Sequence, residues 1–91
     1  MNFEVLVLPG LFKGIPVDRE NQIKMELKKL KKPYPGGGKD EKKLIKGTDD
    51  VAYRLRIGDH RAFYRIDKEE KRVYVFDILT SEQAHKKYGR L

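Results

Sequence analysis

Cysteine is absent from the chain of 91 residues, and only two histidines are present. The absence of cysteine excludes a disulfide framework, a thiol nucleophile and a cysteine-based metal site. Neither histidine belongs to a close set of His, Asp and Glu ligands, so we expect no metal and no cofactor. The N-terminal residues 1–4 lack the basic-then-apolar pattern of a signal peptide. Together with the lack of disulfides, this favours a cytoplasmic location.

Long hydrophobic runs are also absent, so we expect no membrane-spanning segment. Charged residues make up 38% of the chain and hydrophobic residues another 38%, a balance typical of a small folded domain. The length predicts a single domain over residues 1–91. Lysine and arginine outnumber Asp and Glu by 21 to 14, which gives a formal charge of +7. The expected partner is therefore a polyanion, either nucleic acid or an acidic protein, and not a membrane.

The most regular pattern lies in residues 51–66, where apolar and polar residues alternate on both sides of Gly58-Asp59. It predicts two antiparallel strands joined by a two-residue turn, of type II′ because glycine comes first. Such a turn pairs Ile57 with His60, Arg56 with Arg61, Arg54 with Phe63 and Ala52 with Arg65. The apolar face of the hairpin should then face the core, with Val51, Tyr53, Leu55, Ile57, Ala62, Tyr64 and Ile66. The opposite face, called the arginine face below, carries Arg54, Arg56, Arg61, Phe63 and Arg65.

Like charges directly across a strand pair are unfavourable, so the Arg56/Arg61 pair indicates an anionic ligand on the arginine face. Residues 72–79 predict the next antiparallel strand. Simple alternation places its core side chains at Tyr74, Phe76 and Ile78, and puts Val73, Val75 and Asp77 on the arginine face. Asp77 would then lie beside Arg61, where it either balances the positive charge or takes part in catalysis.

A helix is predicted from about Arg19 to Lys32, with Asp18 as N-cap, Val17 in a hydrophobic staple, and Pro33 at its end. An apolar stripe at helical spacing should face the core, with Ile23, Leu27 and Leu30. Lysines lie off this stripe, among them Lys28, Lys29 and Lys32. They form either a solvated helix surface or a patch that binds a nucleic-acid backbone, and the sequence alone favours neither.

The remaining segments of the chain predict short elements and loops. Residues 3–8 predict a short, well-covered strand, residues 9–16 a packed loop, and residues 33–39 a glycine-rich loop that lacks the pattern of a phosphate-binding loop. Residues 42–47 lead into the hairpin, and a short C-terminal helix runs from about Thr80 to Tyr88. The predicted fold class is α+β: a small curved antiparallel sheet with the N-terminal helix on one face, a basic concave opposite face and a short C-terminal helix.

The hairpin residues 53–66, followed by the strand residues 73–78, resemble the RelE/ParE toxin superfamily, specifically a RelE-like member. The shared pattern is Y-R-x-R-x-G-x-Y-R-h-x-Y, with a preceding Leu-x-Gly segment that Leu44-Ile45-Lys46-Gly47 resembles at slightly different spacing. The match covers roughly the C-terminal half of the chain. The N-terminal half agrees in outline, with one helix in place of the usual helical hairpin.

The resemblance implies the toxin of a type II toxin–antitoxin system that cuts mRNA in the ribosomal A site. It implies partners as well: a cognate RelB-like antitoxin, the ribosome and mRNA. The cleavage is metal-free and proceeds by attack of a ribose 2′-hydroxyl on the adjacent phosphate. By position, Arg54 and Arg56 match the basic residues of the first strand, and Arg61 matches the phosphate-stabilising arginine. Further RNA-binding residues are expected at Arg65, Phe63, Lys28, Lys29 and Lys32.

The C-terminal segment departs from the pattern, because Thr80-Ser81-Glu82 stands where active relatives often carry an arginine. The acid or base of the reaction is then expected from His85 or Tyr88, and Glu82 adds repulsion toward phosphate. The alternative is a catalytically weak or inactive RelE-like protein that binds RNA or an antitoxin-like partner. A ParE-like gyrase inhibitor is a third hypothesis, which the row of three arginines fits less well than RNA cleavage.

Overall fold

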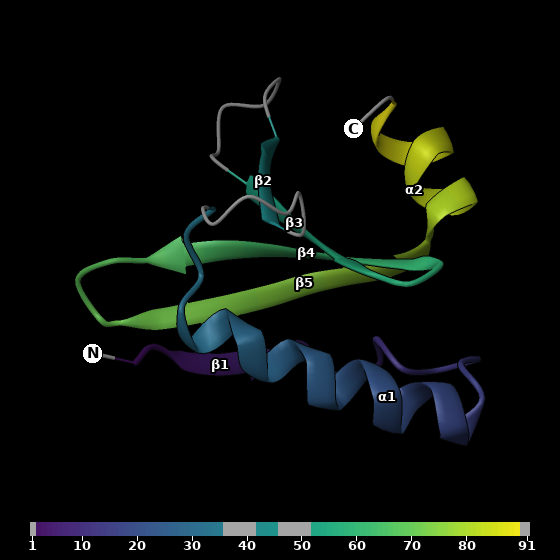
Figure 1. Ribbon diagram of the computed structural model, residues 1–91, viewed down its shortest axis with the longest axis horizontal. Helices are drawn as coiled ribbons and strands as arrows, with labels where there is room; N and C mark the ends of the chain where they lie inside the picture. Colours follow the sequence, from purple (N-terminus) through teal and green to yellow (C-terminus); the bar gives the residue numbers. More distant parts are fainter. Residues whose placement is uncertain (1, 36–41, 46–51, 90–91) are drawn as a thin grey trace.

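The computed structural model describes residues 2–35, 42–45 and 52–89. Its strands and helices follow in the order β1 (Glu4–Val7), α1 (Val17–Leu27), the 3₁₀ helix η1 (Lys28–Lys31), β2 (Lys42–Ile45), β3 (Ala52–Ile57), β4 (His60–Asp67), β5 (Arg72–Thr80) and α2 (Ser81–Tyr88). The strands form one five-stranded sheet with the order β1-β5-β4-β3-β2 (Figure 1). The α+β class is confirmed. The glycine-rich loop and Val51 lie outside the described residues.

The β3–β4 hairpin has the predicted register, with Arg56 opposite Arg61 and Arg54 opposite Phe63. Gly58 has a φ of 55°, and Asp59 has no positive φ, as a type II′ turn requires. Glycine adopts this φ without the steric cost that a Cβ brings. The turn therefore sets the register that gathers three arginines on one face.

The sheet is mixed, which corrects the expectation of an antiparallel one. β1 pairs in parallel with β5, from Glu4 opposite Arg72 to Val7 opposite Val75. β1 is also an edge strand and not a well-covered one, because Leu6 and Val7 are each 37% exposed. At the other edge, residues 42–45 form the separate strand β2, antiparallel to β3, where the sequence indicated only a segment leading into the hairpin.

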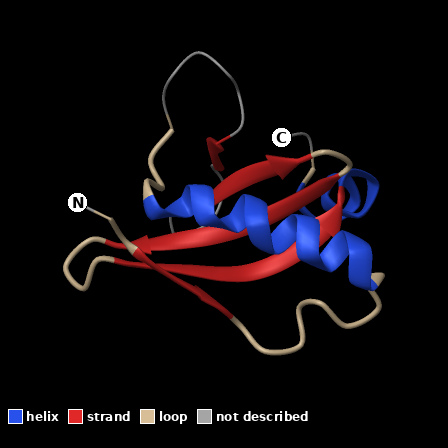
Figure 2. Cartoon of the chain, turned by 60° about the horizontal axis from the view of Figure 1, so that its bottom comes forward, coloured by secondary structure: helices blue, strands red, loops and turns tan. Residues whose placement is uncertain are grey.

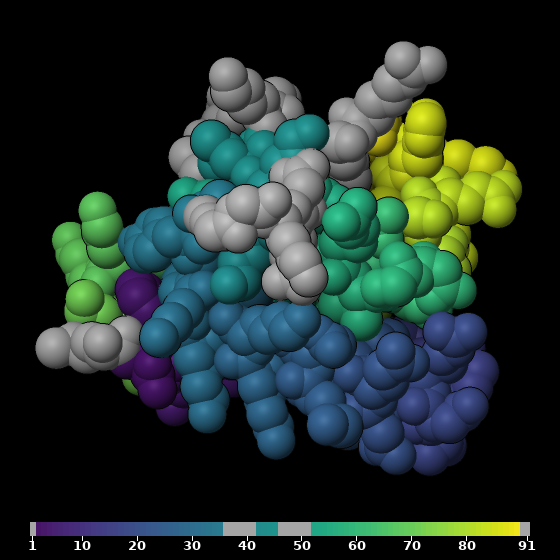
Figure 3. Space-filling model, in the orientation of Figure 1, coloured from purple at the N-terminus to yellow at the C-terminus, as the bar shows by residue number. Residues whose placement is uncertain are grey.

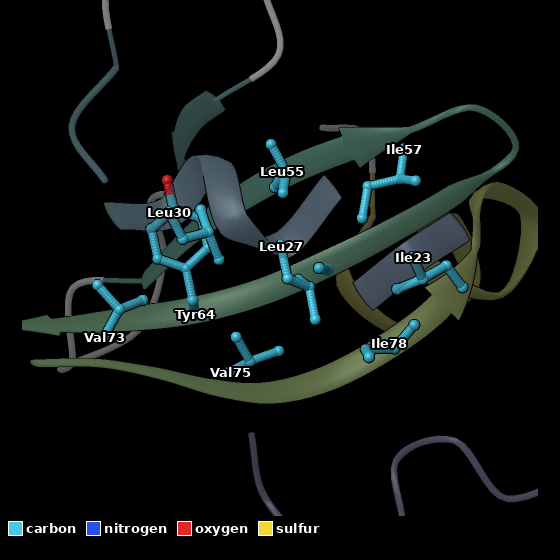
Figure 4. Close-up of a cluster of buried hydrophobic side chains, with 10 residues drawn as sticks. Ile23, Leu27, Leu30, Leu55, Ile57, Tyr64, Val73, Val75 and Ile78 are labelled. Atoms are coloured by element: carbon cyan, nitrogen blue, oxygen red, sulfur yellow. The ribbon is translucent and has the colours of Figure 1, made fainter. Parts of the chain in front are cut away.

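The core lies between α1 and the sheet. Ile23, Leu27 and Leu30 lie against strand residues that include Leu55, Tyr64 and Val75 (Figure 4), and α1 crosses that face of the sheet (Figure 2). The predicted apolar stripe of the helix is thus confirmed. The loop before the helix packs against the same core through partly buried Leu11, Phe12 and Ile15.

The helix boundaries differ from the prediction by a few residues. α1 begins at Val17, directly after Pro16, whose ψ of 146° is extended and which acts as the N-cap. Asp18 therefore lies in the first turn, where its carboxylate complements the helix dipole. The staple is absent, because Val17 is 74% exposed. The α-helical part ends at Leu27 and continues as η1, which buries Leu30.

A β-bulge in β5 overturns the simple alternation predicted for that strand. Phe63 lies opposite Asp77, yet the next residue, Tyr64, lies opposite Val75, so Phe76 is the extra residue. Before the bulge Val73 and Val75 face the core, which corrects the assignment of Tyr74 and Phe76 to it. After the bulge the phase is the predicted one, with Ile78 in the core and Asp77 on the arginine face.

Candidate functional site

A groove of about 500 Å³ lies on the arginine face, between the β3–β4 hairpin and α2. We call it the arginine groove. The hairpin contributes Arg54, Arg56 and Arg61, and α2 contributes Glu82, His85 and Lys86. Arginine carries its charge at every physiological pH and binds phosphate in a bidentate manner. An imidazole next to three such cations is an arrangement suited to an anionic substrate.

Arg61 is held against the hairpin turn. Its Nη1 donates to the carbonyl oxygens of Gly58 and His60, each at 2.8 Å. Both bonds use one nitrogen, so the guanidinium can still donate from its others. Burial lowers the pKa of Arg61, and the nearby charges of Arg54 and Arg56 lower it further. The positive charges are thus close enough to repel one another, and a bound anion would relieve this repulsion.

Arg54 and Arg56 occupy different depths on β3. Arg54 is only 4% exposed and is the one buried charged residue of the described chain, whereas Arg56 is exposed and lies directly opposite Arg61. A buried guanidinium is preorganised because the surrounding chain fixes its position. Arg54 therefore lies deep in the arginine groove, and Arg56 lies at its surface.

The N-terminal end of α2 is fixed by local hydrogen bonds. Thr80 is the N-cap, and its side chain accepts from the backbone N–H of Gln83 at 3.1 Å while the Gln83 side chain accepts from the Thr80 N–H at 3.0 Å. Such a capping box satisfies two backbone donors at the helix start. In addition, the Ser81 N–H donates to the carbonyl oxygen of Asp59 at 2.8 Å. This bond ties the start of α2 to the hairpin turn.

The C-terminal end of α2 is fixed by Asp77 of β5. The Asp77 carboxylate accepts from the Tyr88 hydroxyl at 2.9 Å and from Lys87 Nζ at 2.7 Å. Burial, and then the bond to Asp77, raise the pKa of Tyr88. The Tyr88 ring packs on Phe63, with 4.4 Å between the centroids. Asp77 thus contacts α2, and not Arg61 as the sequence suggested.

The structure brings together only part of the residues predicted for the site. Arg54, Arg56, Arg61 and His85 line the arginine groove, but Tyr88 does not. Phe63 has no exposed surface, because Tyr88 and α2 cover it. RNA could therefore contact Phe63 only if α2 moved. Arg65 is exposed, with its guanidinium 5.2 Å from the centre of the Phe76 ring, and lies outside the groove.

The predicted lysine patch lies apart from the arginine groove. Lys28 and Lys29 belong to η1 and Lys32 follows it, on the helical segment that covers the opposite face of the sheet. Figure 3 shows α2 in yellow and α1 in blue on separate parts of the surface, with the hairpin in green between them. Lys29 also forms an ion pair with Glu26 at 2.7 Å. A ligand bound in the groove would not reach these lysines without extending around the sheet.

Sequence reasoning missed Lys86 as a groove residue and named Glu82 only as a source of repulsion. Both line the arginine groove, and they form an ion pair at 3.5 Å. Helical spacing was a usable signal, since Glu82 lies three residues from His85 and four from Lys86, and residues three or four apart are neighbours on a helix surface. Within the described residues no three His, Asp or Glu side chains gather as a metal site. No described helix is long and apolar enough to cross a bilayer.

Three solved structures have a similar fold. The RelE–RelB complex from Pyrococcus horikoshii OT3 matches with a TM-score of 0.68 at 22% identity, over 88% of this chain and 96% of that chain. The toxin–antitoxin complex RelBE2 from Mycobacterium tuberculosis matches with a TM-score of 0.68 at 18% identity, over 88% and 99%. A double mutant of the E. coli toxin RelE in the free state matches with a TM-score of 0.63 at 19% identity, over 93% and 90%.

The structural matches show the fold, and the sequence shows the family. No curated protein matches the sequence. Residues 20–85, well over half of the chain, match the family model described as the ParE toxin of the type II toxin–antitoxin system parDE. The chain therefore belongs to this family of toxins, within the RelE/ParE superfamily that the hairpin motif indicated.

Proposed function

We propose that this toxin is a metal-free, ribosome-dependent mRNA endonuclease that cuts in the A site by 2′-hydroxyl attack. One observation supports the proposal above the others: Arg54, Arg56, Arg61 and His85 line a single groove. Phosphodiester cleavage needs cations where charge develops on the phosphate and a group that transfers a proton. The arginine groove contains both kinds of group.

In the proposed reaction the ribose 2′-oxygen forms a bond to the adjacent phosphorus and the bond from phosphorus to the 5′-oxygen breaks. The products are a 2′,3′-cyclic phosphate and a 5′-hydroxyl, so the proton lost by the 2′-hydroxyl is balanced by the one gained at the 5′-oxygen. Arg61 and Arg56 bind the phosphate oxygens, and Arg54 stabilises the charge from the base of the groove. All three act electrostatically, because arginine does not release its proton at neutral pH.

We assign proton transfer to His85. An imidazole can take a proton from the 2′-hydroxyl and return one to the leaving oxygen near neutral pH. Tyr88 would have to leave Asp77 before it could reach the groove. Its raised pKa also keeps its hydroxyl protonated, so Tyr88 is the less suitable base.

The proposed partners are a RelB-like antitoxin, the ribosome and mRNA, in the cytoplasm. The relatives from Pyrococcus horikoshii and Mycobacterium tuberculosis were solved as toxin–antitoxin complexes. An antitoxin segment that is acidic would complement the +7 charge of this chain. Such a segment would neutralise the toxin by covering the arginine face and displacing α2.

The test is expression of the toxin without antitoxin, followed by primer extension on mRNA bound to ribosomes. We expect translation arrest and cuts within A-site codons. Arg61→Ala should reduce cleavage about 10²- to 10³-fold, by analogy with loss of one oxyanion donor. His85→Ala should reduce it about 10²- to 10⁴-fold, as for loss of a general acid or base. Arg72→Ala is the matched control, because this exposed arginine pairs with Glu4 far from the groove.

A catalytically weak toxin that only binds is the alternative, and Glu82 favours it. Its carboxylate lines the same groove as the arginines and would repel a phosphate. Ribosomes that stall without any mRNA cut would support this alternative and exclude the nuclease. Full toxicity of Arg61→Ala would show instead that the groove is not the active site.

Inhibition of DNA gyrase is a second candidate function, favoured by the match to the ParE family model. A supercoiling assay with purified gyrase separates it from the nuclease, since the two functions have different targets. Inhibition of supercoiling with intact A-site codons would establish gyrase as the target. Unaffected supercoiling with A-site cuts would exclude it.

A further inference from the structure

We propose that Asp77 is a positioning residue: it holds the C-terminal end of α2 on the sheet, and so holds His85 above the arginine groove. Asp77 comes from β5, accepts hydrogen bonds from Tyr88 and Lys87, and contacts no residue of the groove in these bonds. The inference rests on the proposed function only for its effect on cleavage. The attachment of α2 can be tested without any catalytic activity.

One surface of α2 faces the sheet and another faces the arginine groove, and Asp77 bonds to residues near the first surface only. Ala84 is 1% exposed and Tyr88 packs on Phe63, so these residues form the surface that faces the sheet. Glu82 and His85 face the arginine groove. Because His85 and Tyr88 are three residues apart, they lie side by side on the helix. A rotation that releases Tyr88 from the sheet therefore also moves His85 relative to the arginines.

Few contacts attach α2 to the sheet, so loss of the Asp77 carboxylate should loosen the helix. α2 has only eight residues, and an isolated helix of this length is not stable in water. Its N-terminal end is held by the capping box and by the Ser81 bond to the hairpin turn. Its C-terminal end is held by the bonds of Lys87 and Tyr88 to Asp77, whose side chain is only 14% exposed. A carboxylate shielded from solvent binds its donors more strongly than an exposed one.

The first measurement is amide hydrogen exchange across α2 in the free protein. Asp77→Ala removes both bonds and should speed exchange at residues 85–88 about tenfold, the effect of losing one to two hydrogen bonds of typical net strength. Asp77→Asn retains an acceptor for Tyr88 and should give an intermediate rate. Asp67→Ala, which removes a carboxylate from the other end of the sheet, should leave these rates unchanged. Exchange in Asp77→Ala at the wild-type rate would overturn the proposal.

The second measurement is cleavage, with kcat and KM separated. If Asp77 positions His85, Asp77→Ala should lower kcat about tenfold and leave KM within about twofold, because the arginines that bind RNA stay in place. A double-mutant cycle with Tyr88→Phe then separates positioning from direct catalysis by Tyr88. If both substitutions break the same attachment, the double variant should lose little more kcat than either single variant. If the two residues have independent roles, the two losses of kcat should multiply. Multiplying effects, or an unchanged kcat with faster exchange, would refute the positioning role.

The two measurements can refute the two proposals independently. A wild-type protein that does not cut mRNA on ribosomes would refute the proposed nuclease, and the exchange rates would still decide whether Asp77 holds α2. A wild-type protein that cuts, with slow exchange in every Asp77 variant, would keep the nuclease and refute this inference.

Discussion

Tyr64 offers the sharpest test of what stabilises this fold. Its ring has no exposed surface, and its hydroxyl donates to the carbonyl oxygen of Pro33 at 2.6 Å. Pro33 is also fully buried, so water cannot replace the lost donor without entering the core. Tyr64→Phe keeps the ring, which stacks on Tyr53 with 5.5 Å between centroids. It should lower the free energy of unfolding by about 1–3 kcal/mol, the cost of leaving one buried acceptor unsatisfied.

Tyr64→Phe should also change how the free energy of unfolding depends on pH. Burial raises the pKa of Tyr64 above its ordinary value of 10.0. Above pH 10 the unfolded chain loses this proton and the folded chain keeps it, so the free energy of unfolding falls by about 1.4 kcal/mol per pH unit from this group. The stabilisation is complete below pH 10 and is lost as the pH rises toward the folded-state pKa. Phenylalanine has no such proton, so the difference between wild type and variant should shrink above pH 10.

Urea denaturation at pH 7, and at steps from pH 9 to 11, measures both effects. Tyr34→Phe is the matched control, because Tyr34 is in the same row of aromatic rings but is 44% exposed; it should change stability by less than about 0.5 kcal/mol. A Tyr64→Phe variant as stable as wild type at pH 7 would refute the role of the hydrogen bond. A difference that stays constant from pH 9 to 11 would refute the raised pKa.

Three other predictions test the groove, the turn and the core. The affinity for single-stranded RNA should fall with salt, and Arg61→Ala should reduce the slope of log affinity against log salt by about 0.7 for one lost phosphate contact, as measured by fluorescence anisotropy; an unchanged slope would separate Arg61 from the phosphate. Gly58→Ala should cost about 1–2 kcal/mol in urea denaturation, since a Cβ is strained at a φ of 55°; a neutral effect would contradict the turn assignment. Leu30→Ala should cost about 2–5 kcal/mol in the same assay, because Leu30 is fully buried; a loss below about 1 kcal/mol would show that η1 is not part of the core.

The hairpin could be predicted from the sequence because its determinants are local. A two-residue turn with glycine first fixes the register of both strands, and the register decides which side chains share a face. The hairpin pattern therefore predicts that Arg54, Arg56 and Arg61 lie together, without information on any tertiary contact. The apolar stripe of α1 was predictable for the same reason, since Ile23 and Leu27 follow the helical period.

The sheet edges could not be predicted in the same way. Parallel pairing of β1 with β5 joins segments nearly seventy residues apart in sequence, from Glu4 opposite Arg72 onward. Nothing in residues 3–8 distinguishes an edge strand from a central one, because the same apolar run suits both. At the other edge, β2 has only four residues and two of them are lysines, which weakens the strand pattern.

The candidate site was predictable as a set of cations but not as a groove. The sequence placed His85 and Tyr88 together as candidates for proton transfer, since both lie on the terminal helix. Only the packing of α2 separates them, with His85 toward the arginines and Tyr88 toward Phe63. That packing depends on contacts between α2 and β5, which no local pattern encodes.

The β-bulge at Phe76 links the sheet to the site. With strict alternation from Val75, which faces the core, Asp77 would also face the core, where a carboxylate without partners is strongly unfavourable. The extra residue reverses the phase, so Val75 and Ile78 both face α1 while Asp77 emerges on the arginine face beneath Tyr88. Because Phe76 is accommodated as a bulge, the carboxylate of Asp77 stays on the face where α2 is attached. Without Phe76 the strand would alternate regularly, with Val75 in the core and Asp77 still opposite Phe63, so the bulge accommodates the extra residue without changing the face of Asp77. Arg54, Arg56 and Arg61 belong to the hairpin, whose register is fixed by its own turn. The arginines and the helix that carries His85 are therefore set by separate features of the sheet, and the arginine groove exists only where the two coincide.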